Sequence, residues 1–226
     1  MMRISFVIPV LNEENIIGAG LKNLQWLRQL GHEIIVVDGG SRDDTATSAK
    51  LLACRVIRSF PGRSLQMNEG AKASIGDVLC FLHIDTEFPH DGVEAVKEYL
   101  EGTPEAWGRF DVKLSGRHIV FRVIERMMNW RSRLTGVATG DQAIFITRRL
   151  FEKINGYPLI PLMEDIEISN RLKQHSPPIC LRQQVTTSSR RWEVGGIYKT
   201  VWLMWRLRFA YWRGSDPGRL AQRYRQ

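Results

Sequence analysis

The sequence predicts an α/β fold with a Rossmann-like, mostly parallel sheet covered by helices on both faces. In the first hundred residues, short apolar runs rich in Ile and Val alternate with helical patterns, which is typical of strands buried on both faces. Acidic residues end two of these runs, at Asp38 and Asp85, and the pair Glu164–Asp165 begins a later helical pattern. Because open α/β sheets bind ligands at the carboxyl ends of their strands, these positions predict a binding site.

The first half of the chain is predicted to alternate four strands with four helices. The expected strands are 4–10, 33–38, 55–59 and 77–83, and the expected helices are 13–30, 43–53, 63–74 and 91–100. Asn12 is expected to cap the first helix and Gly31 to end it, since Asn favours N-caps and Gly favours the position after the last turn.

The second half is less regular. Residues 108–115 alternate apolar and polar, which predicts a strand with one face in water. The other expected elements are strands 142–146 and 179–188 and helices 119–134, 148–154, 164–173 and 196–212. With no internal repeat or clear linker, a single domain over 1–226 is expected. It would comprise a nucleotide-binding half (1–100), an acceptor and catalytic half (101–192), and a C-terminal amphipathic helix with a basic tail (193–226).

Composition indicates which kinds of partner and which cellular compartment to expect. The net charge of +8 suits nucleotide diphosphates, nucleic acid or anionic lipid. The three cysteines, Cys54, Cys80 and Cys180, are expected to be buried, reduced thiols, which implies a reducing compartment, the cytoplasm. No secretory signal begins the sequence, and no apolar run reaches the roughly 18 residues that a membrane span needs.

The loops after the first two expected strands hold the candidates for nucleoside recognition. Pro9, Leu11 and Glu13 could form a wall beside a base, although a plain strand-to-helix turn is the simpler interpretation of that segment alone. Asp38 could accept a hydrogen bond from a base N–H, and Gly39 lets the backbone approach a ligand. A capped loop explains this second segment equally well.

Arg63 and Asp85 are the candidates for diphosphate and metal binding. Arg63 begins a predicted helix, where a guanidinium and free backbone N–H groups can hold a phosphate, and a solvated arginine is the alternative. Mg²⁺ or Mn²⁺ held by Asp85 would neutralise charge on a leaving nucleotide. Hard cations prefer oxygen, so His83 is expected to be a satisfied histidine at the sheet edge.

The pair Glu164–Asp165 offers a general base for an attacking hydroxyl. The alternative interpretation is favourable charge at a helix N-terminus. Near the C-terminal end, Arg191 and Trp192 could hold a diphosphate or stack on a sugar, and an edge-strand cluster is the alternative there.

The segment 196–212 combines aromatic and basic residues. Tyr198, Trp202, Trp205 and Phe209 recur at helical spacing, and Lys199, Arg206 and Arg213 recur every seven residues. Such a helix could lie in the headgroup layer at the inner face of the cell membrane. Packing of its aromatic face on the protein's own core, or in a homodimer interface, is the other interpretation.

Together, these residues resemble the family 2 glycosyltransferases, which have the GT-A fold. The resemblance runs from residue 4 to residue 192, its pieces come in the family's order, and the chain most resembles compact bacterial members. The matching segments are 6–13, 36–45, 68–70, 76–85, 140–145, 156–157, 164–165 and 191–192.

The resemblance implies an inverting transfer of a sugar from a nucleotide diphosphate sugar, commonly linked to UDP, to a hydroxyl acceptor. By this resemblance, Asp38 contacts the base, Asp85 binds the metal as the last residue of the family's D-x-D, and Asp165 is the general base beside Glu164. It also places nucleotide-binding residues at Pro9, Leu11, Glu13, Gly39, Arg63, Asn68, His83 and Ile84. Diphosphate or acceptor residues are expected at Asp141, Gln142, Arg191 and Trp192.

The sequence departs from the family pattern at three positions. His83 replaces the first acid of D-x-D, which lowers the expected affinity for metal. Ser188 stands where Q-x-x-R-W has Gln, so processive polymer synthesis is not expected. Met67 stands where many members have Arg, and Arg63, one turn earlier, is the expected substitute.

Two alternative functions are less favoured. A sugar-phosphate nucleotidyltransferase needs a glycine-rich loop with a basic residue after the first strand, where this sequence has Asn12-Glu13-Glu14. A non-catalytic module that binds nucleotide sugars or membrane would not need Asp85 and the Glu164–Asp165 pair. Basic residues are spread along the chain without a recognised nucleic-acid module, so nucleic acid is not an expected partner.

Overall fold

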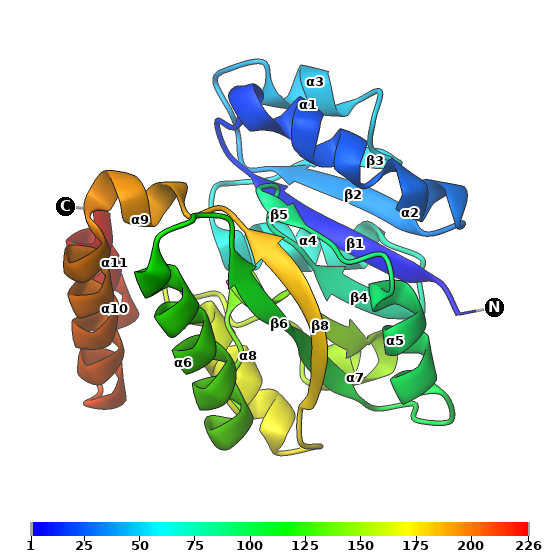
Figure 1. The fold of residues 1–226 in the computed structure, drawn as a ribbon. Coiled ribbons are helices and arrows are strands. Elements are labelled where there is room, and N and C mark those ends of the chain that lie inside the picture. Colours follow the sequence, from blue (N-terminus) through cyan, green and yellow to red (C-terminus); the bar gives the residue numbers. More distant parts are fainter. Residues whose placement is uncertain (1, 226) are drawn as a thin grey trace.

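A computed structural model describes residues 2–225, apart from the side chains of Arg191 and Arg225. One sheet of eight strands, in the order β3-β2-β1-β4-β7-β6-β8-β5, runs through the molecule (Figure 1). The parallel part comprises β1 (Ile4–Val10), β2 (Glu33–Asp38), β3 (Arg55–Arg58) and β4 (Val78–Phe81). These four strands are all parallel, and β1 lies between β2 and β4.

The remaining strands extend the sheet beyond β4. They are β5 (Thr86–Glu87), β6 (Trp107–Leu114), β7 (Ile144–Thr147) and β8 (Ile179–Thr187). Strand β7 is antiparallel to β4 and to β6, whereas β6 and β8 are parallel. The direction of the sheet therefore changes next to β4, beside the strand end that carries Asp85.

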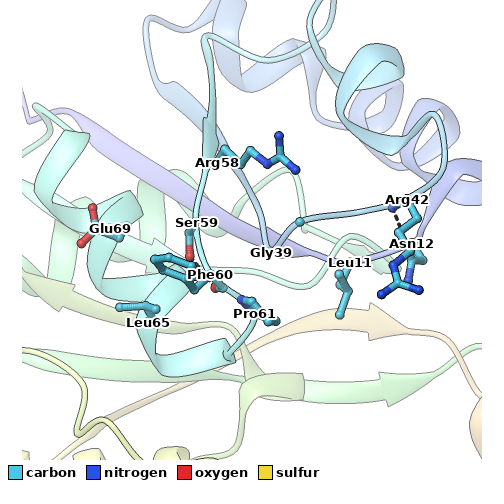
Figure 2. A pocket seen from close by; sticks show the side chains of 11 residues that line it. Leu11, Asn12, Gly39, Arg42, Arg58, Ser59, Phe60, Pro61, Leu65 and Glu69 are labelled. Carbon is cyan, nitrogen blue, oxygen red and sulfur yellow. Dashed lines mark hydrogen bonds between the residues drawn. The ribbon is translucent and has the colours of Figure 1, made fainter.

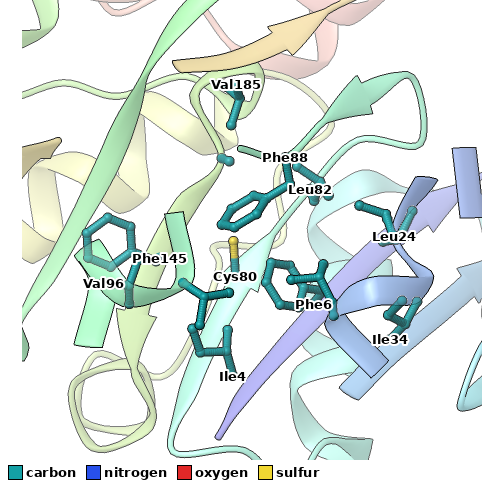
Figure 3. Packing of buried hydrophobic residues seen from close by; sticks show 14 of the residues in the cluster. Ile4, Phe6, Leu24, Ile34, Cys80, Leu82, Phe88, Val96, Phe145 and Val185 are labelled. Carbon is teal, nitrogen blue, oxygen red and sulfur yellow. The ribbon is translucent and has the colours of Figure 1, made fainter. Parts of the chain in front are cut away.

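Helices cover both faces of the sheet because alternate strand residues point to opposite sides. Phe6 and Ile8 pack with the helices α1 (Glu14–Asn23), α2 (Gln25–Gln29), α3 (Thr45–Ala49) and α5 (Gly92–Leu100). Val7 packs on the other face with α4 (Arg63–Ala73), α7 (Arg148–Lys153) and α8 (Glu164–Lys173). Figure 3 shows Cys80 in the first of these cores, and burial raises the pKa of its thiol.

Four further helices lie at one end of the molecule (Figure 1). They are α6 (Ile119–Thr135), α9 (Arg190–Gly195), α10 (Ile197–Trp212) and α11 (Pro217–Arg225). A third apolar cluster joins α6 to α9 and α10 through Phe121, Ile124, Trp192, Ile197 and Val201. No helix among the described residues is long and apolar enough to cross a membrane.

Two predicted helices were too long. The helix expected over 13–30 is divided at Leu24. There the backbone N–H of Leu24 donates to the carbonyl of Leu21, three residues back, and the side-chain amide of Gln25 donates to the same carbonyl. Asn12 does not cap α1. It has a φ of 54° and accepts a hydrogen bond from the Arg42 N–H instead. The helix expected over 43–53 shortens to α3, since the carboxylate of Asp43 accepts from Thr45 and holds the loop.

Other expectations about exposure were also wrong. Strand β6 is wet only at its end: on the face expected to be solvated, Lys113 is exposed, but Arg109 and Asp111 are buried and paired. Arg133 of α6 donates two 2.8 Å hydrogen bonds to Asp111. Cys54 is exposed and Cys180 is partly exposed, rather than buried. The segment that contains Trp192 forms the helix α9, not an edge strand.

Candidate active site

A wide cleft lies at the carboxyl ends of β1, β2 and β3. Its volume is about 880 Å³. Leu11 follows β1, Gly39 follows β2, and Phe60 follows β3, and all three line the cleft (Figure 2). Leu11 and Phe60 are exposed apolar side chains, which suits a planar heterocycle, and Arg42 and Arg58 add positive charge.

The floor of this cleft is held by buried polar groups. Asp38 is 3% exposed, and its carboxylate accepts hydrogen bonds from the backbone N–H and the hydroxyl of Ser41. The amide of Gln66 donates to the carbonyls of Val10 and Val37, at 2.9 and 2.8 Å. These contacts fix the ends of β1 and β2, so the loops that line the cleft start from a rigid base.

A second, smaller pocket of about 220 Å³ lies at the end of β4. It brings together the side chains of Arg63, Asp85, Asp141, Glu164, Asp165 and Arg208. The N-terminal end of α4 separates the two sites, since Pro61 and Leu65 line the wide cleft and Arg63 lines the small pocket. Residues almost 150 positions apart in the chain thus meet at one edge of the sheet.

Gly140 lines the small pocket, where the side chains of His83 and Asp165 approach it closely. Its backbone N–H donates to a carboxylate oxygen of Asp165 at 2.7 Å. A Cβ at this position would lie 2.6 Å from Nε2 of His83 and 3.2 Å from Oδ2 of Asp165. Nδ1 of His83 is 3.4 Å from Oδ1 of Asp141. Only glycine leaves both side chains in place.

The two adjacent acids at the start of α8 have different surroundings. Glu164 is 6% exposed and its Oε1 is 3.9 Å from Nη1 of Arg63. The pKa of Glu164 is raised to about 7, mainly by burial and also by the neighbouring Asp165, while Arg63 opposes the shift. Asp165 is partly exposed and held by Gly140. One acid is therefore enclosed and the other faces the pocket.

Asp85 fits a divalent ion. It lines the small pocket, and among the described residues no hydrogen bond or ion pair engages its carboxylate. No group of three or more His, Cys, Asp or Glu side chains in the described part of the chain could hold a metal by itself. A single carboxylate suits Mg²⁺ or Mn²⁺, which take remaining ligands from substrate phosphate and water.

Glu13 lies near Asp85 and is paired with Arg190. Burial raises the pKa of Glu13, Arg190 lowers it, and the neighbouring carboxylate of Asp85 raises it. Arg190 Nη2 is 3.8 Å from Glu13 Oε2, so α9 is linked by charge to the loop after β1.

Some predicted residues line neither site. Asn68 exchanges two hydrogen bonds with the backbone of Tyr157, and Gln142 is fully buried in the turn before β7. Pro9 lies within β1, and Ile84 is in the hydrophobic core. The side chain of Arg191 lies outside the described part of the structure, whereas Trp192 lines the small pocket.

Sequence reasoning missed Arg208 of α10. Burial lowers its pKa, and Asp165 and Asp141 oppose the shift. Arg131 of α6 is another enclosed cation: its pKa is lowered to about 10, mainly by burial and also by the neighbouring Arg208. Two of its nitrogens have no hydrogen-bond partner among the described residues. Adjacent cations of this kind favour an anionic ligand. The helical pattern of 196–212 gave no signal that one face lines a pocket.

Comparison with known proteins gives a family match and several relatives. The model of the family described as "Glycosyl transferase family 2" matches residues 5–153. A glucosyl-3-phosphoglycerate synthase of Mycolicibacterium paratuberculosis is 32% identical over 120 residues, which cover 42% of this chain and 36% of the relative. The aligned part thus spans less than half of that relative's length.

Solved structures share the fold. The mannosyltransferase PcManGT of Pyrobaculum calidifontis, in complex with GDP-Man and Mn²⁺, is 18% identical with a TM-score of 0.65, and the match covers 92% of this chain and 61% of that one. Glucosyl-3-phosphoglycerate synthase of Mycobacterium tuberculosis, in complex with Mn²⁺, UDP and glucosyl-3-phosphoglycerate, is 24% identical with a TM-score of 0.57. That match covers 81% of this chain and 70% of the other.

Proposed function

We propose a reaction for this chain, which belongs to glycosyl transferase family 2 and is a glycosyltransferase of the GT-A fold. It transfers a sugar from a uridine diphosphate sugar to a hydroxyl acceptor, with inversion at the anomeric carbon. One observation carries the proposal: a cleft of nucleoside size adjoins a pocket that holds Asp85 and the Glu164–Asp165 pair. Family membership favours this function over the nucleotidyltransferase and the non-catalytic module.

The donor would lie across the two sites. The base would lie between the apolar side chains of Leu11 and Phe60, and the diphosphate at the start of α4 beside Arg63. Asp85 would hold Mg²⁺ or Mn²⁺, which when bound neutralises charge on the diphosphate. The two structural relatives in complex with Mn²⁺ and a nucleotide or nucleotide sugar support this arrangement.

Asp165 would act as the general base. The acceptor oxygen attacks the anomeric carbon, its proton passes to the carboxylate of Asp165, and the bond between that carbon and the diphosphate oxygen breaks. A single displacement of this kind inverts the anomeric centre. Glu164 would support the geometry through Arg63, and Arg208 would stabilise the diphosphate as negative charge develops on it.

Calorimetric titration of UDP, with and without Mn²⁺, tests the donor site. The parent protein is expected to bind UDP more tightly with Mn²⁺, and Asp85→Asn is expected to remove that dependence while the fold persists. Asp91→Asn is the matched control, because Asp91 is exposed at the start of α5 and lines neither site. Equal Mn²⁺ dependence of UDP binding in Asp85→Asn and the parent would contradict the metal assignment. If no nucleoside diphosphate bound to the parent protein, the proposed donor site would be wrong.

A further inference from the structure

Large exposed apolar side chains are concentrated on two helices, α6 and α10. On α6, one stripe remains outside the core: Ile119, Val123, Met127, Trp130 and Leu134. On α10, a second stripe also remains outside the core: Tyr198, Trp202, Trp205, Phe209 and Trp212. Each of these side chains is between 49% and 77% exposed. The aromatic face of α10 is therefore not packed on the protein's own core.

The two stripes belong to neighbouring helices. Phe121 and Ile124 of α6 pack in one cluster with Ile197 and Val201 of α10, and Figure 1 shows α6 beside α10 at one end of the molecule. We call the ten exposed side chains, together with the basic residues among them, the α6–α10 face. Soluble monomers rarely expose an apolar surface this rich in aromatic residues without a partner.

The exposed charges on the two helices themselves are all positive. Helix α10 contains no acidic residue, and the acid of α6, Glu125, is buried and accepts a hydrogen bond from the Leu114 N–H. Exposed cations surround the apolar stripes: Arg117, Arg126, Lys199, Arg206 and Arg213. The guanidinium carbon of Arg206 lies 5.1 Å from the ring centre of Trp202, so charge and aromatic surface are presented together.

This combination selects one occupant. A second copy of the chain would place basic residues against basic residues in a two-fold interface. An anionic bilayer offers apolar depth for the aromatic rings and negative headgroups for the cations, and Trp and Tyr favour that boundary. We propose that the α6–α10 face docks this enzyme on an anionic lipid surface.

Docking there would place the catalytic pocket beside the bilayer. The opposite side of α10, with Thr200, Met204, Leu207 and Arg208, lines the small pocket. A single helix thus separates the pocket from the lipid.

Cosedimentation of the full chain with vesicles tests the proposal. Binding is expected to vesicles of phosphatidylcholine with phosphatidylglycerol at low salt, to weaken at high salt, and to be much weaker on phosphatidylcholine alone. The double variant Trp202→Gln/Trp205→Gln is expected to lower the vesicle partition coefficient by about tenfold or more, since it removes two interfacial aromatic rings. Leu51→Gln/Tyr99→Gln is the control, because those exposed apolar residues lie outside the face.

A charge variant provides a second readout that keeps all ten apolar side chains of the face. Lys199→Gln/Arg206→Gln is expected to weaken binding to anionic vesicles by about fivefold for each charge removed, whereas Lys50→Gln/Lys72→Gln, exposed elsewhere, should not. UDP binding measured in parallel separates this proposal from the donor site. Equal binding to neutral and anionic vesicles, no vesicle binding, or a dimer that the Trp variant dissociates would each overturn it.

Discussion

Asp165 is the side chain on which the proposed chemistry depends most directly. It faces the pocket, and its position is set by one hydrogen bond from the Gly140 N–H at 2.7 Å. Gly140 in turn lies against His83, which is paired with Asp141. Four residues from three segments of the chain therefore determine where this carboxylate lies.

Replacement of Asp165 by Asn keeps the shape of the side chain and removes its basicity. Turnover is expected to fall by about 10²–10⁴-fold, the usual contribution of a general base, while UDP affinity stays within about threefold of the parent because the wide cleft is untouched. Single-turnover transfer and UDP calorimetry measure the two quantities. Glu152→Gln, on the exposed side of α7, is the control, and a parental rate in Asp165→Asn would place the base elsewhere.

Glu164 makes folding stability depend on pH. Its folded pKa is raised, mainly by burial, to about 7 from an ordinary value of 4.5. An acid whose pKa is raised by folding stabilises the fold fully below its unfolded pKa, and this contribution is lost as pH rises through the folded pKa.

The free energy of unfolding of the parent, relative to Glu164→Gln, is therefore expected to fall between about pH 4.5 and pH 7 and to level off above it. The full change is up to about 3 kcal/mol, since one pKa unit corresponds to about 1.4 kcal/mol. Urea unfolding of both proteins across this range checks it. A constant difference between them at all pH values would show that Glu164 is not enclosed in solution.

At the scale of elements, the sequence predicted helices and strands with regular apolar patterns, but it did not predict contacts between distant segments. Apolar runs predicted β1, β2 and β4, and helical periodicity predicted α6 and α8, because burial on one or both faces imposes these patterns. Strand β6 was misjudged because the partners of Arg109 and Asp111 come from α6. The positions of the site's acidic residues at strand and helix ends were predictable from the sequence. The burial of Asp38 was not, and in the structure its carboxylate is hydrogen-bonded to Ser41.

Gln66 shows how one side chain can join two elements. Its amide bridges the carbonyls of Val10 and Val37 at the ends of β1 and β2. Gln66→Leu would leave these carbonyls without that donor, so the free energy of unfolding is expected to fall by about 1–3 kcal/mol, with weaker UDP binding. Urea unfolding measures the first effect. Gln29→Leu, at the exposed end of α2, should change neither quantity.

At the scale of the whole molecule, the small pocket is completed from the far end of the chain. Sequence patterns placed Asp85 and Asp165 at the sheet edge, but no pattern relates them to α10. Arg208 reaches the pocket only because the third apolar cluster fixes α9 and α10 against α6. Such a contact depends on the packing of three helices and cannot be inferred from any one of them.

Arg208→Gln is expected to raise the KM for the donor by about tenfold or more, because a charge-assisted contact to the diphosphate is lost. Arg206→Gln is a matched control two residues away, on the outer side of α10 over Trp202. Initial rates measured without vesicles compare the two variants. An unchanged donor KM in Arg208→Gln, with an altered KM for the acceptor, would assign this cation to the acceptor instead.

Helix α10 has one side in the small pocket and the other in the α6–α10 face. Two binding events that share a single helix are thermodynamically linked when either one shifts its position. Linkage is reciprocal: the factor by which lipid changes donor affinity must equal the factor by which donor changes lipid affinity. Vesicle binding measured with and without UDP and Mn²⁺ therefore reports on the same coupling free energy as UDP titration with and without vesicles.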